Sequence, residues 1–260
     1  MVLVGPSLLL ELISNNPLLK KTYEVAISDI ELLTLWEHSN IMAVKRLKYN
    51  DHGPVHAHIA AGAALSIFQI LLKRGLTPSL IRDGVVSSNE YAMLVPLIGG
   101  LLHDIGNSIH RDMHEKIGAL LAVPIIDRLL RQVVNDERDV IKIRQEIAHA
   151  IYCTSYDVEC LTVEAGTVKV GDGLDMAEGR ARVPYRLGGV SIHSVSALSI
   201  RRVEINPGES NPIRINIYMN EYAGIFQVDE VLIPKIKTTP LKNMIEVHVI
   251  IGDKEVKSYP

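Results

Sequence analysis

The stretch LIGGLLHDIGN, residues 97–107, decides the fold that we expect for this chain. Six apolar or glycine residues run directly into His103 and Asp104, at the end of a helical pattern that starts near residue 87. An imidazole beside a carboxylate is costly to bury in apolar surroundings unless something compensates the pair. A bound divalent cation would compensate both side chains. The stretch therefore favours a metal site inside a helical protein.

The composition fits one large domain, or a medium domain with a small appendage, since the chain has 260 residues. Apolar residues make up 47% and charged residues 22%, so there is ample material for a core. The net charge of −3 argues against a protein that coats nucleic acid or anionic lipid. The only cysteines are Cys153 and Cys160, which excludes a disulfide framework and a four-cysteine zinc module.

We expect neither a membrane span nor a signal peptide. The uncharged stretch 91–102 contains Pro96 and is shorter than the roughly 20 apolar residues that a span needs. The apolar start of the chain lacks a basic region and reaches Glu11 early. The simplest expectation is a cytoplasmic protein.

Helical periodicity predicts a helical body over residues 28–185, preceded by an N-terminal arm or short helix over 1–27. Capping-box patterns begin at Ser28 and Ser87. The stretch 161–177 is ambiguous, because it is rich in valine and glycine but carries Asp172 and Asp175. The expected helices of the body cover 28–47, 54–73, 87–103, 110–122, a segment starting at Pro124, and 136–153.

The pattern changes to a small α+β tail over residues 186–260. Alternating apolar residues predict strands, and the turn sequence Asn-Pro-Gly at 206–208 predicts a hairpin. The expected strands cover 190–195, 198–205, 213–219 and 245–251, and the expected helix covers 226–236.

Ten histidines are the chain's most informative feature. His52 and His56 are four residues apart, as are His110 and His114, and such pairs share a face of a helix. His149 lies in another apolar helical segment. Imidazoles with carboxylates and few thiols suit Mn, Fe, Co, Ni or Zn, and two such ions suit the hydrolysis of phosphate esters. A lone histidine on an apolar face is more often a packed core residue, so spacing alone leaves both interpretations open.

The order of these residues resembles the H…HD…D signature of the HD-domain metal-dependent phosphohydrolase superfamily. The matching segments are HAHIAAGAA (56–64), LLHDIGN (101–107) and KVGDGLDMAEGR (169–180). The segments HEKIGALLA (114–122) and EIAHAIYC (146–153) resemble the di-metal branch of that superfamily. NDHGPVHAHI (50–59) and AGIFQVDE (223–230) also look like a prokaryotic, mainly archaeal, group of HD phosphohydrolases.

This resemblance implies an all-α bundle of the HD type for the body. With the small α+β C-terminal subdomain predicted from the alternating pattern, the expected fold class is mainly α. The resemblance also favours a helix over 161–177. It implies one or two divalent metal ions of unknown identity. Asp104 would bridge two metals, one held with His56, His103 and Asp172, and the other held with His114 and His149.

The remaining candidate residues follow from their places beside these ligands. His52 and His110 precede presumed ligands by one turn and would act with Asp104 in catalysis, as partners of ligands, proton donors or substrate contacts. Arginine suits bidentate phosphate binding, which makes Arg111, Arg180 and Arg182 candidates for contacts with substrate. The other histidines are expected to be ordinary packed or exposed residues: His38, His58, His193 and His248.

The expected activity is hydrolysis of a phosphate ester, in a nucleotide or another small phosphorylated molecule, by a metal-activated hydroxide. The alternative is a non-catalytic metal- or nucleotide-binding sensor, which the complete set of six ligands disfavours. A structural metal site is also disfavoured, since such sites are usually rich in cysteine. Asn107 replaces the Lys of the HD-GYP branch and its later segment is missing, so cyclic di-nucleotide cleavage is not expected. The Glu-Asp pair that the stringent-response branch needs after its HD helix has no counterpart in this sequence, so the substrate of that branch is not expected either. The sequence leaves a homodimer open.

Overall fold

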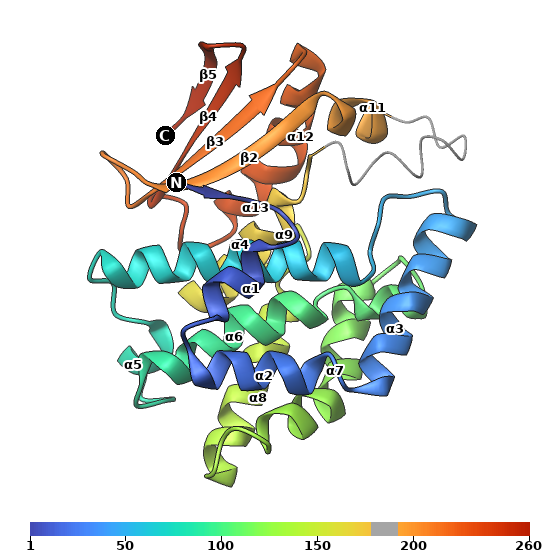
Figure 1. Cartoon of the computed structure of the whole chain (residues 1–260), viewed down its shortest axis with the longest axis vertical. Helices are drawn as coiled ribbons and strands as arrows, with labels where there is room; N and C mark the ends of the chain where they lie inside the picture. Colours follow the sequence, from blue (N-terminus) through green and yellow to red (C-terminus); the bar gives the residue numbers. More distant parts are fainter. Residues whose placement is uncertain (178–191) are drawn as a thin grey trace.

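The computed structural model describes residues 1–177 and 192–260, which form a helical body with a five-stranded sheet on one side (Figure 1). In Figure 1 the sheet lies above α4, and α2, α6, α7 and α8 lie below it. The mainly α fold class with a small α+β tail is thereby confirmed.

The helices of the body follow the predicted order. The stretch 161–177, which the residue pattern left ambiguous, contains a helix, as the family resemblance favours. The elements of the body are α1 (Leu8–Ile13), α2 (Pro17–Ala26), α3 (Ile30–Asn40), the π-helix η1 (Ile41–Arg46), α4 (Pro54–Lys73), α5 (Ser79–Arg82), α6 (Asn89–Leu102), the 3₁₀ turn η2 (Ile105–Ser108), α7 (His114–Leu130), α8 (Glu137–Tyr152) and α9 (Val163–Leu174).

Two helix starts differ from the prediction by one residue. Asp29 caps α3 by accepting a hydrogen bond from the Leu32 N–H, and Ser88 caps α6 by accepting one from the Tyr91 N–H. The predicted caps, Ser28 and Ser87, are therefore wrong by one position. A capping oxygen has to reach the N–H two or three residues further along, and here it is the second residue of each candidate pair that does so.

The predicted boundary at Pro124 is wrong, because α7 continues through this residue to Leu130. Buried Ile125, Ile126 and Leu129 follow the proline and anchor the continuation of the helix. The predicted start at residue 110 is also wrong. Residues 105–108 form a 3₁₀ turn, and α7 begins at His114.

The helices that will matter for the site pack unusually close to one another. A Cβ added at Gly100 of α6 would lie 2.5 Å from the Ala61 Cα of α4. A Cβ added at Gly171 of α9 would lie 2.7 Å from the Ala60 carbonyl oxygen of the same helix. Because neither glycine carries a side chain, α6 and α9 both contact the N-terminal half of α4 directly.

The tail forms a mixed sheet in the order β1-β2-β3-β4-β5. The β2–β3 hairpin, the strand over 245–251 and the helical segment over 226–236 are confirmed. β1 was not predicted, and it ties the chain's first residues to β2. The elements are β1 (Val2–Leu3), α11 (Ile192–Leu198), β2 (Ile200–Pro207), β3 (Ile213–Met219), η3 (Tyr222–Gly224), α12 (Ile225–Gln227), the π-helix η4 (Val228–Leu232), α13 (Ile233–Lys237), β4 (Ile245–Ile251) and β5 (Lys254–Tyr259).

The predicted strand over 190–195 is wrong where the structure describes it, because Ile192–Leu198 form helix α11. A short alternating run is ambiguous between the two structures until packing decides. In β3 and β4 the alternation holds, and Ile215 and Ile217 pair with Val247 and Val249 on the buried face.

The helix α4 is long and apolar enough to cross a membrane by length and composition, but most of it is buried in the protein. The uncharged run in α4 is longer than the stretch 91–102. The expectation that the chain has no membrane span rested only on the shorter stretch. One mostly buried helix of this kind is typical of the core of a globular protein and is weak evidence for a span.

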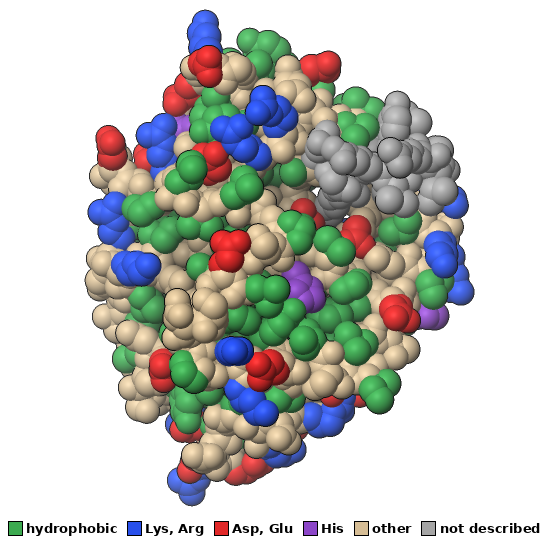
Figure 2. Space-filling model, viewed as in Figure 1, with side chains coloured by type: hydrophobic (Ala, Val, Ile, Leu, Met, Phe, Trp, Pro, Cys, Tyr) green, Lys and Arg blue, Asp and Glu red, His purple; other side chains and the backbone are tan. Residues whose placement is uncertain are grey.

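Hydrophobic side chains gather near the centre of the face drawn in Figure 2. A cavity of about 870 Å³ has a mostly apolar lining. That lining includes Val4, Pro6, Ile41, Val44, Val55 and Ile59.

Candidate metal centre

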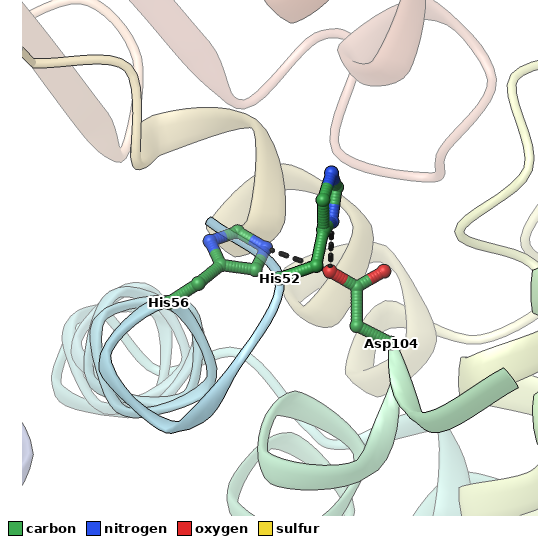
Figure 3. A group of neighbouring side chains, drawn as sticks. All are labelled: His52, His56 and Asp104. Atoms are coloured by element: carbon green, nitrogen blue, oxygen red, sulfur yellow. Dashed lines mark hydrogen bonds and ion pairs between the residues drawn. The ribbon is translucent and has the colours of Figure 1, made fainter. Parts of the chain in front are cut away.

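Three side chains from two segments converge at the end of α6 (Figure 3). The Asp104 carboxylate, directly after α6, points toward the rings of His52 and His56. His52 Nδ1 lies 2.5 Å from Asp104 Oδ2, and His56 Nε2 lies 3.3 Å from the same oxygen. His52 precedes α4, which begins at Pro54, so the predicted sharing of one helix face by His52 and His56 is wrong. The turn into α4 brings His52 to the same carboxylate instead.

Two further ligand candidates complete a tight group around His56. His103 Nε2 lies 3.1 Å from His56 Nε2, and Asp172 Oδ1 lies 3.2 Å from it. The distances from His103 Nε2 to Asp104 Oδ2 and to Asp172 Oδ1 are both 3.5 Å. The helix α9 and the two residues directly after α6 thus bring three ligand atoms to within 3.3 Å of His56 Nε2 on α4.

The protonation of the two rings shows what this group of atoms can hold. His56 Nδ1 lies 2.7 Å from Asp175 Oδ2, and His103 Nδ1 lies 2.9 Å from the Gly100 carbonyl oxygen. Both partners only accept hydrogen bonds, so a neutral ring carries its proton on Nδ1 and presents a lone pair on Nε2. Toward one another, the two Nε2 atoms and the two carboxylate oxygens are then all acceptors.

Such a set of acceptors fits a metal ion. Metal–ligand bonds of about 2.0–2.2 Å place neighbouring ligand atoms roughly 3.0–3.5 Å apart around one ion. The four atoms are 3.1–3.5 Å apart in the pairs given above. The hydrogen bond from His56 to Asp175 is also the kind of contact that fixes the tautomer of a metal-binding histidine.

The second oxygen of Asp104 faces another histidine. Asp104 Oδ1 lies 3.3 Å from His114 Nε2, at the start of α7. Asn107 donates a hydrogen bond to the same oxygen at 3.0 Å, and Arg111 Nη1 lies 3.0 Å from His114 Nε2. Asp104 therefore divides its two oxygens between the group around His56 and His114.

A close contact between two backbone segments holds this arrangement. A Cβ added at Gly106 would lie 1.9 Å from the His114 carbonyl oxygen and 2.7 Å from the Gly118 nitrogen. The turn after Asp104 can therefore rest on the first turn of α7 only with glycine at this position. This contact joins the H-D-I-G and H-x-x-x-G segments of this chain.

The charges in the site shift the pKa of both aspartates. Burial alone would raise the pKa of Asp104, but the imidazoles of His52 and His103 outweigh it and hold that pKa well below the usual value. Burial likewise opposes ionisation of Asp172, and the ammonium of Lys235 together with His103 outweighs it, so that its pKa is also well below the usual value. Both carboxyl groups are therefore charged near neutral pH.

The pKa of His114 moves in the opposite direction. Burial alone would lower it, but the hydrogen bonds with Asp104 and Glu115 outweigh burial and raise the pKa to about 9. A metal ion at this ring would have to displace a proton.

The structure does not bring every predicted site residue to this group. His149 Nε2 accepts a hydrogen bond from the Leu161 N–H at 3.2 Å, and its Nδ1 lies 3.4 Å from Cys153 Sγ. Within the described residues, His149 makes no hydrogen bond or ion pair with His114 or Asp104. His110 is exposed, and its Nδ1 accepts a hydrogen bond from the Asp112 N–H. His110 precedes α7, so the predicted sharing of one helix face by His110 and His114 is wrong.

Of the three arginines predicted to contact substrate, the structure describes only one. Arg111 lines a cavity beside the cluster, whereas Arg180 and Arg182 lie outside the described residues. The histidines expected to be ordinary include His58, which packs between Tyr23 and Trp36, and His248, which pairs with Glu255. His38 is exposed on α3, and His193 belongs to α11.

The cavity beside the cluster measures about 590 Å³ and combines metal-ligand candidates with cations and aromatic rings. Asp104, Asp172, His52 and His114 form its polar side. The further residues of its lining include Lys48, Tyr49, Asn50, Arg111, Glu115, Thr154, Tyr156, Gln227, Val231 and Lys235. The last three belong to the C-terminal segment, which therefore contributes to the wall.

Sequence reasoning missed several residues that touch the ligands. Asp175 holds His56, and Asn107 holds Asp104. Lys235, from α13, lies with its Nζ 2.6 Å from Asp172 Oδ2. The spacing of Asp172 and Asp175 gave a signal for the first contact. A lysine in the tail, 63 residues from its partner, gave none.

Comparison with known proteins agrees with this geometry. The model of the HD domain family matches residues 88–177, which include His103, Asp104 and Asp172. A relative from Methanocaldococcus jannaschii, named only as uncharacterized protein MJ1020, is 43% identical over 238 residues, covering 92% of this chain and 91% of that protein. No solved structure gave a significant match.

The chain therefore belongs to the HD-domain superfamily, and the resemblance read from its motifs is confirmed. HD domains bind divalent metals, and the described residues contain two groups that could hold one. These groups are His52, His56 and Asp104, and His56, His103 and Asp172.

Proposed function

We propose that this protein is a metal-dependent phosphohydrolase that cleaves a phosphate ester in a small molecule, with a nucleotide as the expected substrate class. The observation that supports the proposal is the convergence of four acceptor atoms, from His56, His103, Asp104 and Asp172, beside a cavity with cationic walls. Few chemistries other than a bound cation make such a set of atoms favourable.

The proposed chemistry divides between the metal and the chain. A bound divalent ion would polarise the phosphoryl group and lower the pKa of a water near it. The four acceptors would hold one ion, and Asp104 with His114 would serve a second ion. Arg111, on the cavity wall, would bind phosphate oxygens and neutralise their charge. His52, 2.5 Å from Asp104, is placed to exchange a proton with the leaving group.

The nucleotide class rests on the remaining lining of the cavity. Tyr49 and Tyr156 offer aromatic faces, which suit a base, and Lys48 adds a positive charge for a second phosphate or a sugar oxygen. The six-ligand set from the resemblance includes His149, whose ring would have to leave its contacts with Leu161 and Cys153 to join a metal.

The test is metal analysis followed by a substrate screen. The purified protein is stripped of metal, loaded with Mn²⁺ or Co²⁺ and offered nucleotides, cyclic nucleotides and phosphomonoesters. We expect at least one bound ion per chain and metal-dependent release of phosphate or of a nucleotide product. A protein that binds no divalent ion would overturn the proposal. A loaded protein that binds nucleotide without cleaving it would support the alternative, a sensor.

A further inference from the structure

The C-terminal segment places a buried ammonium group against the metal-ligand cluster. Lys235 of α13 is only 4% exposed. Its Nζ lies 2.6 Å from Asp172 Oδ2 and donates a further hydrogen bond to the Thr154 carbonyl oxygen at 3.1 Å. The same Nζ lies 4.6 Å from the centre of the Tyr156 ring. A buried ammonium is costly without such partners, so this lysine is held firmly in one position.

The two oxygens of Asp172 consequently have different partners. Oδ1 faces His56 Nε2 at 3.2 Å and His103 Nε2 at 3.5 Å, inside the proposed metal site. Oδ2 faces away from those rings and is taken by Lys235. The residue after Asp172 gives the lysine its space, because a Cβ added at Gly173 would lie 3.1 Å from the Lys235 Cδ. The G-D-G sequence in α9 therefore admits the lysine stem from the tail as well as the close approach to α4.

We propose that Lys235 is a positioning residue that restricts Asp172 to the use of a single oxygen on a bound divalent ion. A free carboxylate can bind an ion with one oxygen or with both. A second oxygen on the ion would use a position that a catalytic metal keeps open for water or substrate. The inference rests on the proposed function, since it assumes that Asp172 contacts a metal, and it makes the C-terminal segment part of the active site.

The inference predicts that removing Lys235 strengthens metal binding. Loss of the lysine frees Asp172 Oδ2 for the ion, and it also removes a positive charge that repels the ion. Both changes favour metal binding. A lysine that merely supports the fold would have the opposite effect, because its loss would loosen Asp172 and weaken the site.

The experiment compares Lys235→Met with the wild type and with Lys237→Met, a control that removes the same charge from an exposed position on the same helix. Co²⁺ affinity is measured by competition with a chelator, and the Co²⁺ visible spectrum reports the ligands of the ion. We expect Lys235→Met to bind Co²⁺ about tenfold more tightly or better, with a changed spectrum and a lower kcat. Lys237→Met should match the wild type.

Two further variants keep the test decisive. Lys235→Arg retains a cation on Oδ2 and should restore most of the wild-type affinity and spectrum. Lys235→Gln is neutral but keeps a donor, and it decides the matter if the methionine variant does not fold, because it too should bind Co²⁺ more tightly than the wild type. Folded variants that bind Co²⁺ equally or more weakly would overturn the inference while leaving the metal site intact. A wild-type protein without Co²⁺ binding would instead overturn the proposed function.

Discussion

One buried group and one half-buried group of side chains in the helical body contain histidine, and they differ in what the ring nitrogens face. In the cluster of α4, α6 and α9, the Nε2 atoms of His56 and His103 lie 3.1 Å apart and face carboxylates. On α8, His149 accepts a hydrogen bond from the Leu161 N–H and contacts the Cys153 sulfur. Both groups come from motif segments of the same family resemblance.

This difference indicates which histidines are suited to binding a metal. Acceptors that converge on acceptors favour a cation between them, whereas a ring whose nitrogen already accepts a backbone N–H is stable without one. By this criterion His56 and His103 fit the proposed metal site, and His149 fits the packing of α8 against the segment that follows it. His114 is intermediate, because its Nε2 faces both the Asp104 carboxylate and the Arg111 guanidinium.

The largest expected effect comes from Asp104→Ala, because Asp104 contacts both halves of the proposed site. We expect loss of more than about 100-fold in Mn²⁺ affinity, since even partners of metal ligands contribute 10- to 100-fold, with hydrolysis falling below detection. Circular dichroism should show that the helices remain. Unchanged metal content in this variant would contradict the proposal that the cluster around His56 and His103 binds a metal.

A second prediction concerns pH and uses the proton on His114. Its pKa is raised to about 9, so below that pH a proton competes with a metal for the ring. Affinity at His114 should rise about tenfold per unit from pH 7 to pH 9 and level off above pH 9. Titration calorimetry of the second Mn²⁺ equivalent measures this slope. His114→Ala should abolish that second binding event, and a flat pH profile in the wild type would argue against a metal at His114.

Asp175→Asn tests whether the contact to His56 orients a ligand. The amide accepts a weaker hydrogen bond from His56 Nδ1 than a carboxylate does, so we expect metal affinity to fall about 10- to 100-fold. Asp253→Asn removes a charge from the exposed β4–β5 turn and serves as the control. Equal metal affinities in these two variants would mean that Asp175 has no part in holding the ring.

The smallest expected effect on metal is that of His149→Ala. Its metal affinity and stoichiometry should stay within about twofold of the wild type, because its ring nitrogens contact Leu161 and Cys153. The free energy of unfolding should fall by about 1 kcal/mol, since a backbone N–H loses its acceptor. Loss of one metal equivalent in this variant would contradict the assignment of His149 to packing. It would support the two-metal ligand set implied by the resemblance.

Local sequence patterns predicted most of the helical body and the tail hairpin. The residues that cap helices were misplaced by one position, because neighbouring polar residues, such as Ser28 and Asp29, are both common N-cap types and the backbone geometry selects the second. The break at Pro124 was wrong because tertiary packing of Ile125, Ile126 and Leu129 outweighs the local preference of proline. The part of the alternating run that the structure describes, from Ile192 on, belongs to helix α11 and not to a strand.

The sequence by itself determined the chemical kind of site. The order His56, His103-Asp104 and Asp172, with the glycines between them, sets an imidazole and carboxylate cluster in an apolar bundle, because these motifs are local and their order is read directly. Only the tertiary structure decided which other residues touch it. Lys235 meets Asp172 across 63 residues of chain, and Asp175 meets His56 across 119, through contacts that no local period encodes. Such contacts depend on how α4, α9 and α13 pack, and packing is a property of the whole fold.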